Sequence, residues 1–133
     1  MAFFRASIGG GGGSSGDMAV HYVNSRAEAG HARTESITIT KAVSKFVVLA
    51  NLWNGASGSY ASNYKIKING TEYTTWKNNM TPIGRTSNGT LTGAYGCWYS
   101  LEVKTLNVGD VVELDLSASQ TNANYGLGIV LLE

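Results

Sequence analysis

The closing segment of the chain constrains the fold more than any other part of the sequence. Residues 101–116 form two alternating runs around a turn at Asn107–Asp110, and residues 125–132 read Tyr-Gly-Leu-Gly-Ile-Val-Leu-Leu. Alternation predicts strands, and the last run is apolar on both faces. Such a strand must be covered twice, once by the core of its own domain and once by something else. The segment therefore predicts a β-sandwich that assembles into an oligomer.

Further short β patterns, separated by turns, make up the rest of the chain. Asn69-Gly70 lies between two alternating runs, and this dipeptide favours a type I′ hairpin because both central residues need positive φ. A two-residue turn there places Lys67 opposite Glu72 in a hairpin over Tyr64–Trp76. About eight short strands with frequent turn residues and no convincing helix predict an all-β fold, an antiparallel β-sandwich with jelly-roll topology.

The alternation also predicts which side chains point into the core. Residues 45–53 are apolar on both faces, which indicates a central or interface strand, and residues 77–92 are a polar stretch that predicts a long loop. Glu113 and Asp115 are expected to point outward. The side chains of residues 95–117 that are expected to point inward are Tyr99, Leu101, Val103, Val112, Leu114 and Leu116.

Composition narrows the classes of function. The chain has 133 residues, which suits one domain, a net charge of +1 and 14% charged residues. An average soluble domain has about 25% charged residues. This balance offers no basic surface, so no nucleic-acid partner is expected. No apolar run approaches the roughly 18 residues of a membrane helix, so no membrane insertion is expected. The single cysteine, Cys97, has no evident base beside it and is expected to be a buried, inert thiol.

The N-terminal part of the chain contains its one low-complexity segment. Residues 9–16 read Gly-Gly-Gly-Gly-Gly-Ser-Ser-Gly. Two interpretations remain open: a flexible linker behind a short anchor peptide, or a stem that packs closely against neighbouring subunits because glycine lacks Cβ. We therefore divide the chain into an N-terminal anchor and glycine-rich segment, 1–16, and a jelly-roll β-sandwich domain, 17–133.

The closing strands resemble those of a known superfamily. A strand, the turn Leu106-Asn-Val-Gly-Asp110, a second strand, a polar loop and the ending Tyr125-Gly126-Leu127-Gly128-Ile129 are similar to the tumour necrosis factor and complement globular-head superfamily. The resemblance covers about a quarter of the chain. It implies a jelly roll whose three copies pack around a threefold axis through apolar strands.

A second resemblance concerns the style of the chain. The short start is too quickly interrupted by Arg5 to be a signal peptide. The glycine-rich N-terminal piece and the small domain rich in Ser, Thr and Asn resemble a bacteriophage or prophage tail-associated protein. Receptor-binding heads of phages use similar trimeric jelly rolls. This resemblance implies a virion-associated or bacterial cytoplasmic location.

No group of residues predicts catalysis. Residues 12–16 match the spacing of a nucleophile elbow but lack the strand before and the helix after it. His21 and His31 have no evident partners for a metal site. Glu113 and Asp115 are expected to keep the surface of a sheet soluble rather than to act as a catalytic pair. We therefore expect a protein that is not an enzyme and that holds no metal or cofactor.

The aromatic residues provide the candidates for ligand binding. Sugar recognition needs a flat apolar ring to stack on and amides to bind hydroxyls, and several rings here accompany asparagines. Trp76 is predicted to lie on the same face of the hairpin as its charged residues, and it is close to Asn78 and Asn79 in the sequence. It is therefore the best single candidate. The alternative is that the rings fill the sandwich or a subunit interface. The candidate ligand-binding residues are Trp53, Tyr60, Trp76, Asn78 and Asn79.

The sequence thus predicts a non-enzymatic, phage-type structural or host-recognition module that assembles with itself, as a trimer, and binds a cell-surface glycan. The alternatives are a purely structural oligomeric virion protein without a ligand and a small carbohydrate-active enzyme. The candidate interface residues are Phe46, Val48, Tyr125, Leu127, Ile129 and Leu131.

Overall fold

A computed structural model describes residues 2–7, 17–26, 33–53, 58–87, 89–117 and 124–133. Almost all of the regular structure in these ranges is β-strand. The strands are β1 (Ala2–Ser7), β2 (Asp17–Arg26), β3 (Arg33–Thr38), β4 (Lys45–Trp53), β5 (Tyr64–Ile68), β6 (Thr71–Glu72), β7 (Thr81–Pro82), β8 (Tyr95–Glu102), β9 (Val111–Leu116) and β10 (Asn124–Leu132). Two short helical turns, η1 (Ala61–Asn63) and α1 (Thr75–Asn78), complete the described elements.

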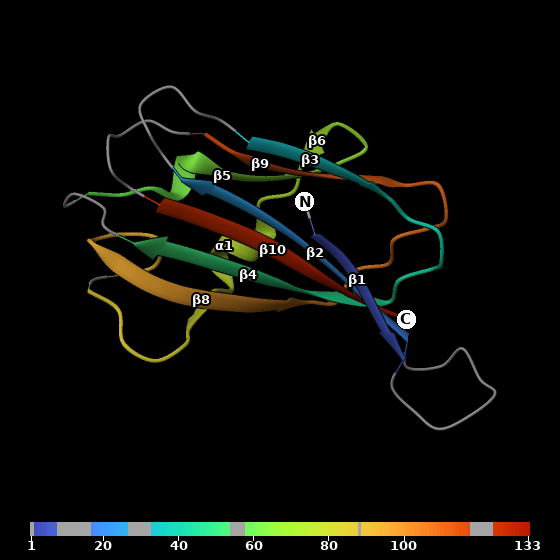
Figure 1. The fold of residues 1–133 in the computed structure, drawn as a ribbon, viewed down its shortest axis with the longest axis horizontal. Helices are drawn as coiled ribbons and strands as arrows, with labels where there is room; N and C mark the ends of the chain where they lie inside the picture. Colours follow the sequence, from blue (N-terminus) through green and yellow to red (C-terminus); the bar gives the residue numbers. More distant parts are fainter. Residues whose placement is uncertain (1, 8–16, 27–32, 54–57, 88, 118–123) are drawn as a thin grey trace.

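The strands form two antiparallel sheets that pack face to face (Figure 1). Sheet A has the order β1-β2-β10-β4-β8-β7, and sheet B has the order β3-β9-β5-β6. From β2 to β5, and again from β8 to β10, each strand lies in the opposite sheet from the one before it. This alternation wraps the chain around the sandwich as a jelly roll does. The predicted all-β, jelly-roll sandwich is therefore confirmed.

The two turns that the sequence predicts most strongly close one end of sheet B. Asn69 and Gly70 have φ of 51° and 83°, as a type I′ turn requires, and Lys67 pairs with Glu72 as expected. In the turn at Asn107–Asp110, the backbone N–H of Asp110 donates to the carbonyl of Asn107 at 3.0 Å. Both predicted turns are confirmed.

The side chain of Asn69 fastens these two turns to each other. Its Oδ1 accepts the backbone N–H of Val111 at 2.9 Å, and its Nδ2 donates to Asp110 Oδ1 at 3.1 Å. The other carboxylate oxygen of Asp110 accepts the backbone N–H of Asn107 at 2.8 Å. These contacts hold β5 and β9 in register, because each turn limits how far its strand can slide.

The core lies between the sheets and is built from alternate residues of each strand. Tyr64 and Tyr125 meet edge to face, with ring centroids 5.6 Å apart, and the Tyr64 hydroxyl donates to the carbonyl of Asn51. These contacts join sheet B to sheet A through aromatic packing and one hydrogen bond. In β9 the inward and outward sets are as predicted. The core residues of β9 and β10 are Val112, Leu114, Leu116, Tyr125, Leu127, Ile129 and Leu131.

Two predictions of strand orientation are wrong, and both fail for one reason. In β8 the inward side chains are Trp98, Ser100 and Glu102, whereas Tyr99 and Leu101 point outward, and Val103, just after the strand, is exposed. A strand with apolar residues on both faces does not reveal which face is inside, because a shift by one residue exchanges the two sets. For β4 and β10, which are also apolar on both faces, the sequence-based prediction assigned residues of the core to the subunit interface. The residues wrongly assigned to that interface are Phe46, Val48, Tyr125, Leu127, Ile129 and Leu131, all buried between the sheets.

The N-terminal predictions are met by the structure only in part. Residues 2–7, expected in an anchor segment, form β1, which pairs with β2 at the edge of sheet A. The glycine tract at residues 9–16 lies outside the described residues, so its two interpretations and the boundary at residue 16 stay predictions. The strand β2 extends to Arg26, and residues 27–32 lie outside the described part. The loop expected at 77–92 contains the short strand β7.

We expect the link between the two turns to depend on pH. The hydrogen bond from Asn69, followed by that from the backbone of Asn107, lowers the pKa of Asp110 below its ordinary value. A carboxylate with a lowered folded-state pKa stabilises the fold above its unfolded pKa, and this contribution disappears as the pH falls through the folded pKa. Asp110→Asn should therefore lower the urea midpoint at pH 6, and the difference from wild type should shrink towards pH 3. A difference that is constant with pH would contradict this role.

Candidate binding surface

The outer face of sheet B, the face turned away from sheet A, is charged and internally paired. Lys67 Nζ lies 3.4 Å from Glu113 Oε2 and 3.3 Å from Asp115 Oδ2. Hydrogen bonding and charge attraction, first from Asp115 and then from Glu113, raise the pKa of Lys67. The two outward carboxylates therefore serve an ion-pair network, as suits a water-facing sheet.

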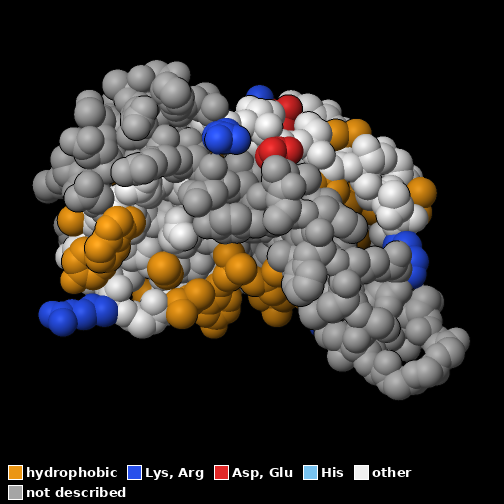
Figure 2. Space-filling model, viewed as in Figure 1, with side chains coloured by type: hydrophobic (Ala, Val, Ile, Leu, Met, Phe, Trp, Pro, Cys, Tyr) orange, Lys and Arg blue, Asp and Glu red, His pale blue; other side chains and the backbone are white. Residues whose placement is uncertain are grey.

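The outer face of sheet A has the opposite character. We use this name for the face turned away from sheet B, formed by the outward side chains of β4, β8 and β10 and by their neighbours. Figure 2 shows hydrophobic side chains gathered on it over β4 and β8. The large apolar residues there are 36% to 84% exposed, namely Leu49, Trp53, Ile83, Tyr99, Leu101 and Val103.

The strand register arranges this face in rows. The row at one end holds Asn124, Trp53 and Tyr95, which are paired partners on β10, β4 and β8. The rows that follow it along the strands are Gly126, Asn51 and Cys97, then Gly128, Leu49 and Tyr99, then Val130, Val47 and Leu101. Two successive rows thus have glycine on β10. With no side chain above β10 there, the backbone of β10 is the floor of a hollow.

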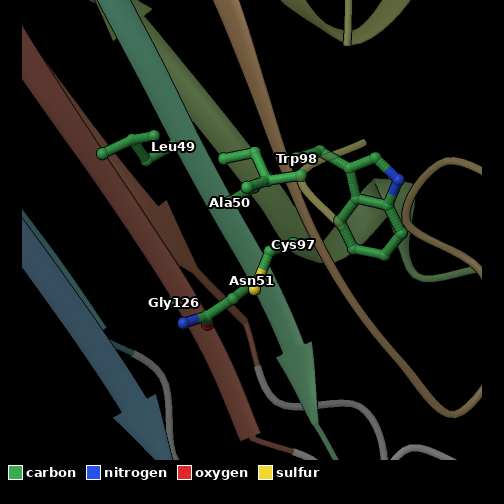
Figure 3. A pocket seen from close by; sticks show the side chains of 7 residues that line it. Leu49, Ala50, Asn51, Cys97, Trp98 and Gly126 are labelled. Carbon is green, nitrogen blue, oxygen red and sulfur yellow. The ribbon is translucent and has the colours of Figure 1, made fainter. Parts of the chain in front are cut away.

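A pocket of about 190 Å³ occupies this hollow. Leu49, Asn51, Cys97 and Gly126 line it from three neighbouring strands, and Ile83 lines it from the segment after β7. Figure 3 shows the indole of Trp98 pointing away from Leu49, and Trp98 is buried. Cys97 is a free, exposed thiol, so the prediction that it is buried is wrong. Because side chains alternate along β8 and Trp98 points inward, the sulfur of Cys97 lies on the outer face.

Trp53 stands at the end of the face beside the pocket. Its side chain is 65% exposed, and its ring centroid lies 5.9 Å from that of Tyr95, with 51° between the planes. Trp53 was one of the candidate ligand-binding residues, and the structure leaves its ring open to a ligand. Neighbouring hydrogen-bonded strands on both sides of β4 fix its position.

The other candidate ligand-binding residues do not form an exposed site. Trp76 and Tyr60 are both 0% exposed, so the expectation that Trp76 offers an open ring is wrong. The strand β6 ends at Glu72, and the helical turn α1 then carries the indole into the core. Asn78 is exposed at the end of α1, whereas Asn79 is engaged by a buried carboxylate.

That carboxylate belongs to Glu102, which the sequence analysis did not identify. Glu102 is 2% exposed, and it accepts hydrogen bonds from the Tyr73 hydroxyl at 2.6 Å and from Asn79 Nδ2 at 3.2 Å. Burial first, and then the bond to Glu102, raise the pKa of Tyr73 to about 12. Lys104 Nζ lies 5.5 Å from the Tyr73 ring centroid. The hydrogen bonds to Glu102 hold the segment around α1 against β8. The alternating pattern of β8 was the only feature of the sequence that bears on the position of Glu102.

Other kinds of site have little support in the described residues. Among them, no three His, Cys, Asp or Glu side chains are placed to hold a metal ion together. The side chain of His21 and all of His31 lie outside what the structure describes. No helix in the described ranges is long and apolar enough to cross a membrane.

Comparison with known proteins gives one distant likeness. The sequence matches no protein-family model and no curated protein. The crystal structure of the catalytic unit of a thermostable GH87 alpha-1,3-glucanase from Streptomyces thermodiastaticus strain HF3-3 is similar over 84% of this chain and 26% of that chain, at 16% identity and a TM-score of 0.36. The chain thus spans about a quarter of that structure. A likeness this distant carries no argument about function.

We expect the Glu102 cluster to stabilise the fold. Glu102→Ala removes a buried acceptor and leaves the Tyr73 hydroxyl without its partner, which should lower the free energy of unfolding by about 1–3 kcal/mol. The control is Glu72→Ala, which removes a partly exposed ion pair with Lys77 at 3.6 Å and should change stability by less than about 1 kcal/mol, because Lys77 keeps its hydrogen bond to the carbonyl of Ala61. Urea unfolding of both variants measures the difference. Equal effects would mean that the buried cluster contributes no more than a surface pair.

Proposed function

We propose that this chain is a non-enzymatic subunit of a homo-oligomeric, phage-type structural or host-recognition assembly, and that it associates through the outer face of sheet A. The observation that carries this proposal is the gathering of large exposed apolar side chains on that one face. Single exposed hydrophobic residues are normal on soluble proteins, but a contiguous group on a rigid sheet is typical of a binding surface.

The contrast between the two sheets supports the choice of face. Sheet B presents ion-paired Lys67, Glu113 and Asp115 to water, whereas sheet A presents Leu49, Tyr99 and Leu101. Burying a fully exposed side chain of this size is worth about 1.5–3 kcal/mol, and these three are 36% to 51% exposed, so covering each of them gains up to about half of that. Several covered together provide the hydrophobic centre that stable homo-oligomer interfaces have.

As in the sequence-based prediction, β10 is covered on one face by the core and on the other by a partner, but the two faces are exchanged. Tyr125, Leu127 and Ile129 are covered by the core of the domain, so a partner would cover the opposite side of sheet A. Three copies are proposed because the closing strands resemble those of the tumour necrosis factor and complement globular-head superfamily. The phage setting rests on the resemblance of the whole chain to tail-associated proteins.

Recognition of a surface glycan belongs to the same proposal, and one observation favours it. Trp53 offers an open ring beside a pocket, at the end of the apolar face. A carbohydrate-active enzyme has less support, because the paired carboxylates Glu113 and Asp115 are both engaged with Lys67 on the charged sheet.

The assembly is tested by placing a charge on the proposed interface. Leu101 is 51% exposed, so Leu101→Asp should leave the monomer folded and still disrupt association through desolvation of the new carboxylate. Multi-angle light scattering at micromolar concentration should give a trimer for wild type and a monomer for this variant. The matched control is Val108→Asp, because Val108 is 65% exposed in the turn before β9. The control should remain a trimer, and a strictly monomeric wild type would refute the proposal.

A further inference from the structure

Trp53 is the most exposed aromatic side chain of the described residues, and the strand holds it in place. Leu52, the preceding residue of β4, is 1% exposed and points into the core, so alternation directs the Trp53 ring outward. Because β10 and β8 pair with β4 on both sides, the backbone that carries the ring is not free to turn it inward. An indole held outward on a central strand offers a ligand a ring whose position is fixed before binding.

Tyr95 contacts Trp53 without covering it. Its ring packs beside the indole at 5.9 Å with the planes tilted by 51°, so the two rings meet at an angle rather than forming a flat stack. Trp53 remains 65% exposed despite this contact, so most of its side chain is accessible to a ligand. A flat apolar partner, such as the C–H face of a pyranose ring, can stack on such a surface.

The pocket lies one row from Trp53 on the same face. Same-face residues on a strand are two positions apart, and at about 3.3 Å per residue this spacing is about 7 Å. Asn51, which lines the pocket, is two positions from Trp53 on β4, and Cys97 is two positions from Tyr95 on β8. A ligand whose ring stacks on Trp53 can therefore place one short substituent in the pocket.

The size and lining of the pocket specify the substituent. Its volume of about 190 Å³ is below the roughly 300–1,000 Å³ of sites that enclose a whole drug-sized ligand, so it suits one group. Leu49, Ile83, Cys97 and the backbone of Gly126 make most of its lining apolar, with the amide of Asn51 beside them. A hydroxyl placed there would lose its hydrogen bonds to water, whereas a methyl group would gain contact. The acetamido group of an amino sugar carries such a methyl next to an amide.

The position of this site is compatible with assembly through the same sheet. Leu101 pairs with Val47, six residues before Trp53 on β4, which corresponds to about 20 Å along the strand. A partner that covers the end of the sheet with Leu101 and Val103 can leave the end with Trp53 open.

We propose that Trp53, Tyr95 and the adjacent pocket form a binding site for an N-acetylated hexosamine, with the sugar ring stacked on Trp53 and the acetamido methyl seated between Leu49, Ile83 and Cys97. The site deepens the recognition part of the proposed function, on which it rests, and it does not require the assembly.

The first test compares two soluble sugars that differ in the acetamido group. The probes are the β-1,4-linked hexamer of N-acetylglucosamine and the β-1,4-linked hexamer of glucose. Binding is followed by the change in tryptophan fluorescence, and the Trp53→Ala variant identifies the part of the change that comes from Trp53, because the buried Trp76 and Trp98 also fluoresce. We expect saturable binding of the acetylated hexamer. Removing one well-placed methyl is worth 10-fold or more, so the glucose hexamer should bind at least about 10-fold more weakly.

The variants separate stacking from general effects on the face. Trp53→Ala should lose at least about 10-fold in affinity for the acetylated hexamer, measured by calorimetry, while its thermal unfolding stays close to wild type. Tyr99→Ala is the matched control, because Tyr99 is an exposed aromatic residue of the same face two rows away. It should bind the sugar as wild type does. Equal losses in both variants would overturn the site.

Alkylation of Cys97 tests the pocket directly. The chain has one cysteine, so N-ethylmaleimide labels a single known position on the pocket wall. Saturating acetylated hexamer should slow the labelling several-fold in wild type and in the Leu101→Asp variant alike, because the proposed assembly leaves this end of the face open. Labelling that is unchanged at saturation would contradict the seating of the acetamido group.

The outcomes distinguish this site from the assembly. Sugar binding retained by a monomeric Leu101→Asp supports the site and shows that it needs no partner. If wild type is a trimer but binds neither hexamer, the sugar site is refuted and the assembly stands. If the glucose hexamer binds as tightly as the acetylated one, the role of the pocket is refuted.

Discussion

The placement of β10 between β2 and β4 is the constraint on which the rest of the structure depends. This strand pairs along its whole length with both neighbours, and its inward side chains, among them Tyr125, fill the middle of the core. Its outward positions include Gly126 and Gly128, and Gly126 lines the pocket beside Leu49. The strand that closes the sandwich thus also shapes the face that is left for a partner.

The two outer faces divide the roles of the molecule between them. Sheet B meets water with an ion-pair network, and the linked turns at Asn69 and Asp110 hold its strands in register. Sheet A exposes apolar side chains on strands that are hydrogen-bonded on both sides. A rigid apolar surface loses little conformational freedom on binding, so it suits assembly and stacking better than a mobile loop would.

The sequence predicted the architecture better than the sites, for a physical reason. The Asn69-Gly70 dipeptide predicts one turn type, and the strict alternation of polar and apolar residues in β9 predicts which face is buried. Strands with apolar residues on both faces do not, and the exchange of faces in β8 concealed Leu101 and Glu102 together. The prediction for Trp76 was wrong for a different reason: the helical turn α1 follows β6 and directs the side chain of Trp76 into the core. Trp53 was a candidate because it is an aromatic residue that accompanies asparagines, although the interface assignment of Phe46 and Val48 implies the opposite orientation for β4.

The central claim is that a second copy of the chain covers the outer face of sheet A. The most direct measurement is hydroxyl-radical footprinting by mass spectrometry across a dilution series. The account predicts that oxidation of Tyr99 and Leu101 falls as concentration rises, while oxidation of Val108 and Val111 on the sheet B side does not change. Oxidation of all four residues that is independent of concentration, or protection on the sheet B side alone, would contradict the account.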